Sequence, residues 1–375
     1  MNIPFNKPHF TGREKKYIIK AARNGNFSGN GSYTKKAQEL FQAQYGIRKA
    51  LLTTSCTDAL EMIALLFRIA PGDEVIMPSY TFVSSANPFI LRGANLVFCD
   101  SMDDHPNMDP DRLEELITPK TKAIVVMHYG GIANDMDRIM ALAQRYNLFV
   151  AEDAAHSIEA TYKNRPLGSI GHLGAFSFHE TKNIITGEGG MLLVNDARFC
   201  ARSEIIWEKG TNRAAFRRGE VQKYEWVDVG SSFLPSDIVG ACLTAQMEQI
   251  KKIQARRVRH WNYYYEGLKT LWEQGNVQLP IIPEYASING HLFYLITQSL
   301  QERDRLLTHL RKRNIHAVFH YQSLHNSPFY SHQQGNRPLP NAERFSETLI
   351  RLPLFYALRE KEINAVINAV KDFYR

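Results

Sequence analysis

The stretch at residues 174–183 reads GAFSFHETKN. Its first half is short and apolar, which is typical of a buried strand, and Lys182 follows soon after it. A glycine-rich segment, TGEGG, occupies residues 186–190. Most lysines are solvated surface residues, so a lysine between a buried strand and a glycine-rich turn is unusual. Lys182 is therefore the first candidate for chemistry.

This stretch contains the sixth of seven short apolar segments, many of them β-branched. We predict strands at residues 50–54, 74–77, 96–99, 123–128, 148–152, 175–178 and 191–194. Amphipathic patterns predict helices at residues 57–67, 84–91, 110–117 and 136–146. Buried strands that alternate with helices are typical of a mainly parallel sheet covered by helices. The predicted fold class is α/β, with ligands bound beyond the carboxyl ends of the strands.

The chain has 375 residues, which is too long for one core of ordinary size. We expect a large domain at residues 1–245 and a smaller α+β domain at residues 246–375. A long helix is predicted at residues 244–273. The remaining predicted elements are strands at 291–300 and 317–321 and helices at 303–313, 341–350 and 361–373.

Charge and cysteine content exclude several classes of function. The net charge is +7, but the basic residues are dispersed and form no concentrated stripe, so we expect no nucleic-acid partner. No apolar run is long enough for a membrane span, and no basic region precedes an apolar stretch at the N-terminus. We therefore expect a soluble cytoplasmic protein. Four cysteines (Cys56, Cys99, Cys200 and Cys242) show no metal-binding spacing, so no metal is predicted.

A carboxylate, Asp153, ends the apolar run that begins at Leu148. Such a carboxylate is costly to bury unless it is paired. An amine and a carboxylate at two strand ends suit pyridoxal phosphate (PLP): Lys182 would form a Schiff base, and Asp153 would keep the pyridine nitrogen protonated. Taken alone, a helix cap or an ion pair is the better explanation for Asp153. His156, one turn later, is a candidate for the ring hydroxyl, although a lone histidine is more often structural.

A phosphate site is predicted at residues 53–60, TTSCTDAL, where a strand runs into a helix. Free amides and the helix dipole bind phosphate there, and the hydroxyls of Ser55 and Thr57 add donors. A plain helix cap would explain the same residues. Ser177 adds a hydroxyl from a neighbouring strand end, and Phe82 is a candidate for stacking on a planar cofactor.

With these residues in view, the chain resembles the nucleotide-sugar aminotransferases, which are PLP enzymes of the aspartate-aminotransferase fold. The resemblance covers essentially the whole length. It rests on residues 29–31, 54–57, 78–82, 152–156, 177–182 and 187–190. It implies the fold type I architecture, with a mainly parallel seven-stranded sheet in the large domain.

The resemblance also implies roles for individual residues. Lys182 would carry PLP, Asp153 would bind the pyridine nitrogen, Phe82 would stack on the ring and His156 would contact its hydroxyl. The residues around the phosphate would be Ser55, Cys56, Thr57 and Ser177. Related dehydratases have a histidine in place of the lysine, so Lys182 favours transamination.

Members of this family are homodimers in which the neighbouring subunit reaches the cofactor phosphate. The resemblance implies a homodimer with shared active sites here. Ser232 stands where an asparagine usually makes that contact, and Cys56 stands where a glycine or alanine is usual. The Cys56 amide can still bind phosphate.

Three runs, at residues 208–213, 228–233 and 351–356, are similar to those of a subgroup that aminates dTDP-4-keto-6-deoxyglucose. They imply L-glutamate as donor and dTDP-4-amino-4,6-dideoxygalactose as product, for surface polysaccharide. The substrate candidates are Ser28, Arg213, His320, Tyr321 and His325. Surface exposure or loop packing explains each of them equally well.

Three alternatives remain. Another sugar aminotransferase, giving a 3-amino sugar or a gluco-configured 4-amine, would use Lys182 equally well. A PLP-binding regulator without catalysis is the second, and the retained Lys182 counts against it. A nicotinamide dehydrogenase fits poorly, because Gly25 to Gly31 does not follow a strand with the required glycine spacing.

Overall fold

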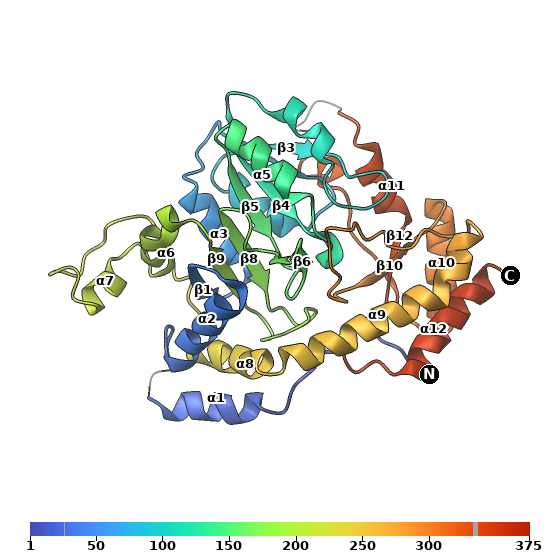
Figure 1. Cartoon of the computed structure of the whole chain (residues 1–375), viewed down its shortest axis with the longest axis horizontal. Coiled ribbons are helices and arrows are strands. Elements are labelled where there is room, and N and C mark those ends of the chain that lie inside the picture. The colour runs from blue at the N-terminus through green and yellow to red at the C-terminus, as the bar shows by residue number, and fades with distance from the viewer. Residues whose placement is uncertain (26, 333–336) are drawn as a thin grey trace.

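The computed structural model describes residues 1–25, 27–332 and 337–375 and has a seven-stranded sheet at its centre (Figure 1). The strands are β1 (Lys49–Thr53), β2 (Glu74–Pro78), β3 (Asn95–Cys99), β4 (Thr121–Met127), β5 (Phe149–Asp153), β8 (Leu173–Ser177) and β9 (Gly190–Val194). Their order is β1-β9-β8-β5-β4-β2-β3, and only pairs that involve β9 are antiparallel. The predicted α/β class and the seven predicted strands are confirmed.

Alternate side chains of each strand enter different cores, as the two-residue period of a strand requires. In β4, Val125 belongs to the core that contains Ile63 of α3 (Cys56–Leu66). Its neighbour Val126 belongs to the core that contains Ile139 of α5 (Met136–Arg145). Helices therefore cover both faces, which leaves the carboxyl ends of the strands as the accessible edge for a ligand.

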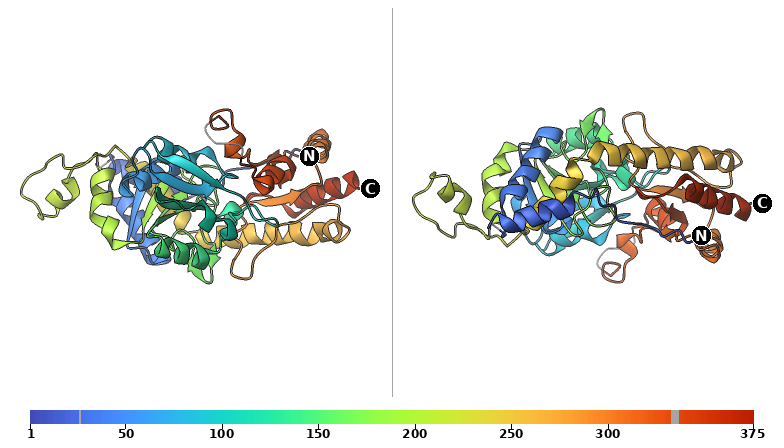
Figure 2. Two further views of the ribbon diagram at one scale, coloured as in Figure 1. Left: turned by 90° about the horizontal axis from the view of Figure 1, so that it is seen from above. Right: turned by 90° about the horizontal axis from the view of Figure 1, so that it is seen from below.

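On the β1 side of the sheet, α2 (Ser32–Tyr45) and α8 (Asp237–Met247) pack over β1 and β9, and α1 (Glu14–Arg23) packs on α8. α6 (Cys200–Trp207) packs against α3 and β1, and the segment that follows it, which contains α7 (Arg213–Arg217), projects from the body at the end opposite the two termini (Figure 2). The predicted helix at 84–91 is a 3₁₀ turn, Val83–Ser85, followed by the short α4 (Asn87–Ile90).

Two other predicted helices differ from the structure. Residues 110–117 form two short 3₁₀ turns, Pro110–Arg112 and Glu114–Leu116, because the chain is already extended at Ile117, just before the Thr118-Pro119 pair. The predicted helix at 244–273 is split, since residues 244–247 belong to α8 and α9 (Ile250–Glu273) begins after Gln249.

The C-terminal part contains a three-stranded antiparallel sheet in the order β10 (Phe293–Ile296), β12 (Leu349–Leu352), β11 (Val318–Phe319). It is accompanied by α10 (Leu300–Lys312), α11 (Pro340–Thr348) and α12 (Glu360–Phe373). Strand β12 was missed: its residues were assigned partly to a helix, because a short apolar run has no distinguishing period. The predicted boundary at 245/246 stays a prediction, since α9 contributes Ile253 to one core and Tyr264 to another.

Among the residues that the structure describes, no helix is both long enough and apolar enough to cross a membrane.

Candidate active site

A cavity of about 600 Å³ lies at the carboxyl ends of the central strands. Met127, Asp153 and Ser177, the last residues of β4, β5 and β8, all line it. The start of α3 lines one side, and residues beside β11 and on β12 line another. The structure brings ten of the predicted site residues to this cavity: Ser55, Cys56, Thr57, Phe82, Asp153, His156, Ser177, Lys182, His320 and Tyr321.

Lys182 has the properties required of a reactive amine. It follows β8 and lines the cavity, where protein surrounds its side chain. Burial lowers the pKa of its ammonium group from the ordinary 10.5 to about 8, and the positive charge of Arg351 acts in the same direction. The Asp153 carboxylate opposes this effect. The amine therefore sheds its proton much more readily than a surface lysine.

Asp153 is a buried carboxylate, only 5% exposed. The Ser85 hydroxyl donates to its Oδ2 at 2.5 Å, and the Ala155 N–H donates to its Oδ1 at 3.1 Å. The Ser85 hydroxyl is in turn 2.8 Å from Thr81 Oγ1. Among the described residues, no lysine or arginine lies within ion-pair distance of Asp153. Its charge is held in place by neutral donors and is available to a cation in the cavity.

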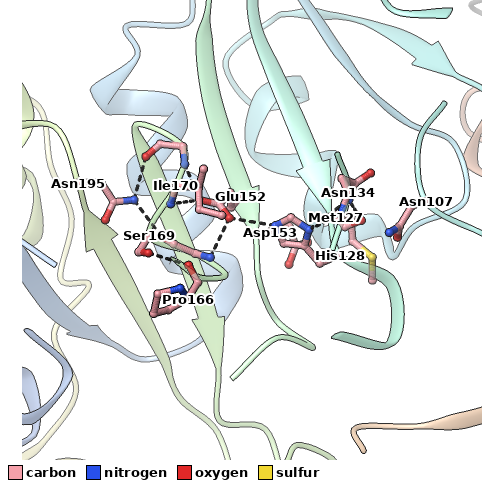
Figure 3. Close-up of polar contacts among 12 residues, drawn as sticks. Asn107, Met127, His128, Asn134, Glu152, Asp153, Pro166, Ser169, Ile170 and Asn195 are labelled. Atoms are coloured by element: carbon pink, nitrogen blue, oxygen red, sulfur yellow. Dashed lines mark hydrogen bonds and ion pairs between the residues drawn. The ribbon is translucent and has the colours of Figure 1, made fainter. Parts of the chain in front are cut away.

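Glu152, one residue earlier, does not line the cavity and has a different role, since its side chain takes part in the polar contacts drawn in Figure 3. Its carboxylate accepts hydrogen bonds from the N–H groups of Gly168, Ile170 and Gly171 at 2.8, 2.7 and 2.5 Å. His128 Nε2 lies 2.9 Å from the same carboxylate. Glu152 thus ties the end of β5 to a neighbouring loop and to the end of β4, which fixes the position of Asp153.

The start of α3 has unused backbone donors. Ser55 Oγ accepts from the Asp58 N–H at 3.0 Å, so Ser55 is the helix cap. The N–H groups of Cys56 and Thr57, like those at the start of any helix, have no acceptor one turn earlier. Gly190 of β9 packs against them: a Cβ there would lie 2.4 Å from Cys56 N. The sheet therefore requires a glycine beside this anion-binding helix end.

His156 is buried and neutral. Burial lowers the pKa of its imidazole well below 6.5, and the charge of Lys182 adds to this effect. The Gly130 N–H donates to its Nδ1 at 3.3 Å, and Tyr321 Oη lies 3.4 Å from its Nε2. Its ring stacks on His291 with centroids 4.3 Å apart. His156 therefore presents a fixed, uncharged ring at the cavity wall.

Four predicted site residues do not line this cavity: Ser28, Arg213, Ser232 and His325. His325 is buried, with Nδ1 2.6 Å from Ser79 Oγ and Nε2 3.0 Å from Glu343 Oε1, which is a structural arrangement. Arg213 lies on α7 and faces Glu208 at 3.7 Å. Ser28 and Ser232 are exposed. Their predicted roles in binding substrate or phosphate stay predictions.

Several polar residues of the site were missed in the sequence, among them Ser85 and Arg351. Ser85 lies in a 3₁₀ turn, Val83–Ser85, and nothing in the local pattern shows that it reaches Asp153. Arg351 lies on β12, which was itself missed. The one available signal was an arginine within the apolar run 349–354, where a charge requires a partner or a function.

These observations fit PLP. The cavity combines an amine with a lowered pKa, a buried carboxylate without a cationic partner and a helix start with free amides. Those three groups match the aldehyde, the pyridine nitrogen and the phosphate of that cofactor.

Comparisons with known proteins agree with a PLP site. A model of the DegT/DnrJ/EryC1/StrS aminotransferase family matches residues 8–371. The spore coat polysaccharide biosynthesis protein SpsC of Bacillus subtilis (strain 168) is 33% identical over 387 residues, covering 100% of this chain and 97% of SpsC. The GDP-perosamine synthase of Escherichia coli O157:H7 is 31% identical over 373 residues, covering 99% of this chain and 98% of the synthase.

Solved structures extend the agreement to the fold and the cofactor. Spr1654 from Streptococcus pneumoniae, 27% identical, superposes with a TM-score of 0.92 in its PMP form and 0.91 in its PLP form. The alignments cover 99% and 100% of this chain and 99% and 98% of the respective Spr1654 chains. The chain therefore belongs to the DegT/DnrJ/EryC1/StrS aminotransferase family and is a PLP-dependent sugar aminotransferase.

Proposed function

We propose that the enzyme transfers the amino group of L-glutamate to dTDP-4-keto-6-deoxy-D-glucose and forms dTDP-4-amino-4,6-dideoxy-D-galactose. The observation that carries the amino-transfer chemistry is the pair formed by Lys182 and Asp153 in one cavity. The choice of substrate is supported by the runs at 208–213, 228–233 and 351–356. The product would serve surface polysaccharide, such as lipopolysaccharide O-antigen or enterobacterial common antigen, and the reaction would take place in the cytoplasm.

Each residue of the cavity has a task in this reaction. PLP, when bound, supplies an electron sink and carries the amino group between the two substrates. Asp153 would keep the pyridine nitrogen protonated, and the amides of Cys56 and Thr57 would hold the phosphate. Lys182 would serve as the base that takes a proton from the substrate carbon and returns it, because burial lowers the pKa of its amine to about 8.

We also propose that the working unit is a homodimer in which Ser232 reaches the partner subunit's phosphate site. The segment around α7, which stands away from the body, supports this proposal (Figure 1). It exposes large apolar side chains to an extent that is unusual for a monomer surface: Phe216 44%, Tyr224 53%, Trp226 81% and Val227 50%.

The test is incubation of the PLP-loaded enzyme with L-glutamate and the dTDP-keto-sugar, followed by NMR of the product. We expect an axial amine at C4, the galacto configuration. An equatorial amine at C4, or an amine at C3, would contradict this assignment and support the gluco-configured 4-amine or the 3-amino sugar instead. A parallel reaction with a GDP-linked 4-keto sugar tests the nucleotide, since a GDP-perosamine synthase is 31% identical to this chain.

The remaining alternative, a PLP-binding regulator without catalysis, predicts no reaction with glutamate alone. An enzyme that works as proposed changes the absorbance of its cofactor when glutamate converts it to the pyridoxamine form. Absence of that change in a protein shown to contain PLP would support the regulator.

A further inference from the structure

A groove of about 410 Å³ lies between the long helix α9 and the chain that leads from β12 to α12. Of the described residues that line it, none lines the active-site cavity. Its charged members are Lys252, Arg256 and Arg259 of α9 and Glu360 of α12. The proposed transamination uses none of these side chains, so positive charge gathers at a place where that reaction does not need it.

The basic side chains of the groove differ in whether they are neutralised. Arg259 forms an ion pair with Glu360. Lys252 and Arg256 have no such partner: in the part of the chain that the structure describes, no carboxylate lies within 4.0 Å of either, and neither makes a hydrogen bond. Two of the three positive charges are therefore available to a ligand. Water solvates exposed cations, so a binding site requires further features.

The first such feature is that the Arg256 guanidinium is held in place. Its Cζ lies 4.9 Å from the centroid of the Tyr356 ring, and that ring stacks on His9 with centroids 3.7 Å apart. Burial lowers the pKa of His9, and the charges of Arg256 and Lys252 both add to this effect. The two cations, one turn apart on α9, therefore act on the same place. A guanidinium that already rests on a ring loses little freedom when it binds an anion.

The second feature is a buried imidazole at the groove. His260 lines the groove although it is only 4% exposed. Its Nδ1 lies 3.2 Å from Phe355 O, and because a carbonyl only accepts, Nδ1 carries the proton of the neutral ring. Among the described residues, its Nε2 has no hydrogen-bond partner. Burial lowers the pKa of His260 to about 4, and the charge of Arg256 adds to this effect. An anion in the groove would offset that charge and let Nε2 take up a proton.

We propose that this groove binds the phosphate group of an organic ligand, with Lys252 and Arg256 as its charged partners and His260 as a third donor. A phosphate monoester carries nearly two negative charges at neutral pH, which two unpaired cations match. Ala255 and Leu358 also line the groove and would contact the organic part of the ligand. The site is separate from the active site and does not depend on which sugar is aminated.

The direct test is calorimetric titration of the PLP-loaded protein with glucose 1-phosphate at low ionic strength, where exposed charges are least screened. We expect Arg256→Gln and Lys252→Gln each to weaken binding about five- to tenfold. Both side chains are exposed, so neither change disturbs the core. Lys251→Gln is the matched control: it removes the same charge from the next position on α9, where the side chain does not line this groove, and should leave the affinity unchanged.

A lipid headgroup carries the same phosphate chemistry, so vesicles that contain phosphatidic acid are titrated in parallel. Saturable binding of either probe that Lys252→Gln weakens and Lys251→Gln does not supports the proposal, and the probe that binds more tightly identifies the source. Binding of neither probe, or equal losses in Lys252→Gln and Lys251→Gln, overturns it.

A second arm places the anion beside His260, whose ring is followed by NMR as sulfate is added, because sulfate does not itself titrate near pH 5. The charged and titratable groups around this ring are Arg256, Arg257 and Arg259, which lower its pKa, and Lys252, His9, Tyr356 and Glu360 at the groove. We expect sulfate to raise the pKa of His260 by about 1 in the wild type and by much less in Arg256→Gln. A pKa that sulfate leaves unchanged, or raises equally in both proteins, overturns the proposal.

Discussion

Asp153 and Arg351 enter one cavity from two different sheets, and both are buried charges. Asp153 ends β5, and its carboxylate accepts hydrogen bonds from the Ser85 hydroxyl and the Ala155 N–H. Arg351 lies on β12 of the small sheet and keeps one edge without a hydrogen bond. The wall from the central sheet carries the groups that fit PLP. Arg351, on the small sheet, adds a buried positive charge to the same cavity.

The largest expected effect on activity is that of replacing Lys182, the candidate Schiff-base lysine. Lys182→Ala removes both the amine that holds PLP and the base that moves the proton, so transamination falls by about 10⁴-fold. Lys120→Ala, at an exposed position on the surface, is the control and keeps full activity. Rates are measured with glutamate and the keto sugar. Activity of Lys182→Ala within tenfold of wild type would remove this residue from the reaction.

The next largest effect is expected at Asp153, and Glu152, its neighbour on β5, provides the comparison. Asp153→Asn cannot hold the pyridinium, and we expect about a 10²-fold loss of activity with an unchanged midpoint of unfolding. Glu152→Gln places an amide against three N–H donors and lowers the free energy of unfolding by about 2–3 kcal/mol. Urea unfolding and activity are measured on both variants. The reverse outcome, with stability lost in Asp153→Asn and activity in Glu152→Gln, would contradict the assignment of the two carboxylates.

The lowered pKa of Lys182 predicts a pH dependence. Only the neutral amine captures PLP, so the rate at which the cofactor-free protein takes up PLP rises with pH and reaches half of its maximum near pH 8. Arg351→Gln removes a cation that lowers this pKa, so the midpoint moves to higher pH. Stopped-flow absorbance gives the profile. A wild-type midpoint near the ordinary lysine value of 10.5 would show that the amine is solvated.

A smaller effect is expected at Ser85, which orients Asp153. Ser85→Ala removes one charge-assisted hydrogen bond and should lower the rate about tenfold. It should also shift the absorbance of bound PLP, which a purely structural role would not do. Ser346→Ala, which loses a buried bond to Ala342 O outside the cavity, is the control with an unchanged spectrum. An unchanged spectrum and rate in Ser85→Ala would mean that Asp153 is positioned without it.

The smallest effect on catalysis is expected at His325, a substrate candidate in the sequence. Its ring is engaged by Ser79 and Glu343, so His325→Asn should lower stability by about 1–2 kcal/mol and leave the KM for the keto sugar unchanged. Thermal unfolding and steady-state kinetics, measured on one preparation, separate an effect on stability from an effect on substrate binding. A raised KM without loss of stability would return His325 to the substrate site.

The residues that fit the cofactor, at the ends of the central strands, could be predicted because the sequence signals for them are local. Each of the main residues follows a strand with a clear apolar pattern, and parallel strands bring their carboxyl ends to one edge. Lys182, Asp153 and the α3 start were found in this way. The amine and the carboxylate by themselves indicated PLP, and the family resemblance then gave each residue its role.

Other features of the site and its surroundings could not be predicted because they depend on distant contacts. Arg351 lies on a four-residue strand whose pairing partners, β10 and β11, come from other parts of the chain. Ser85 reaches Asp153 across 68 positions of sequence. His325 was a substrate candidate by family resemblance, and its contact with Ser79, 246 positions away, leaves no trace in the local pattern. A single sequence carries no signal for such pairs.

The most direct test of the central claim, that Lys182 carries the cofactor, is borohydride reduction of the PLP-loaded protein followed by peptide mass spectrometry. Reduction fixes the bond between the aldehyde and the amine that holds it. The account predicts one modified peptide, with the added mass of the reduced cofactor on Lys182. Modification of another lysine, or PLP that is released unmodified, would contradict it.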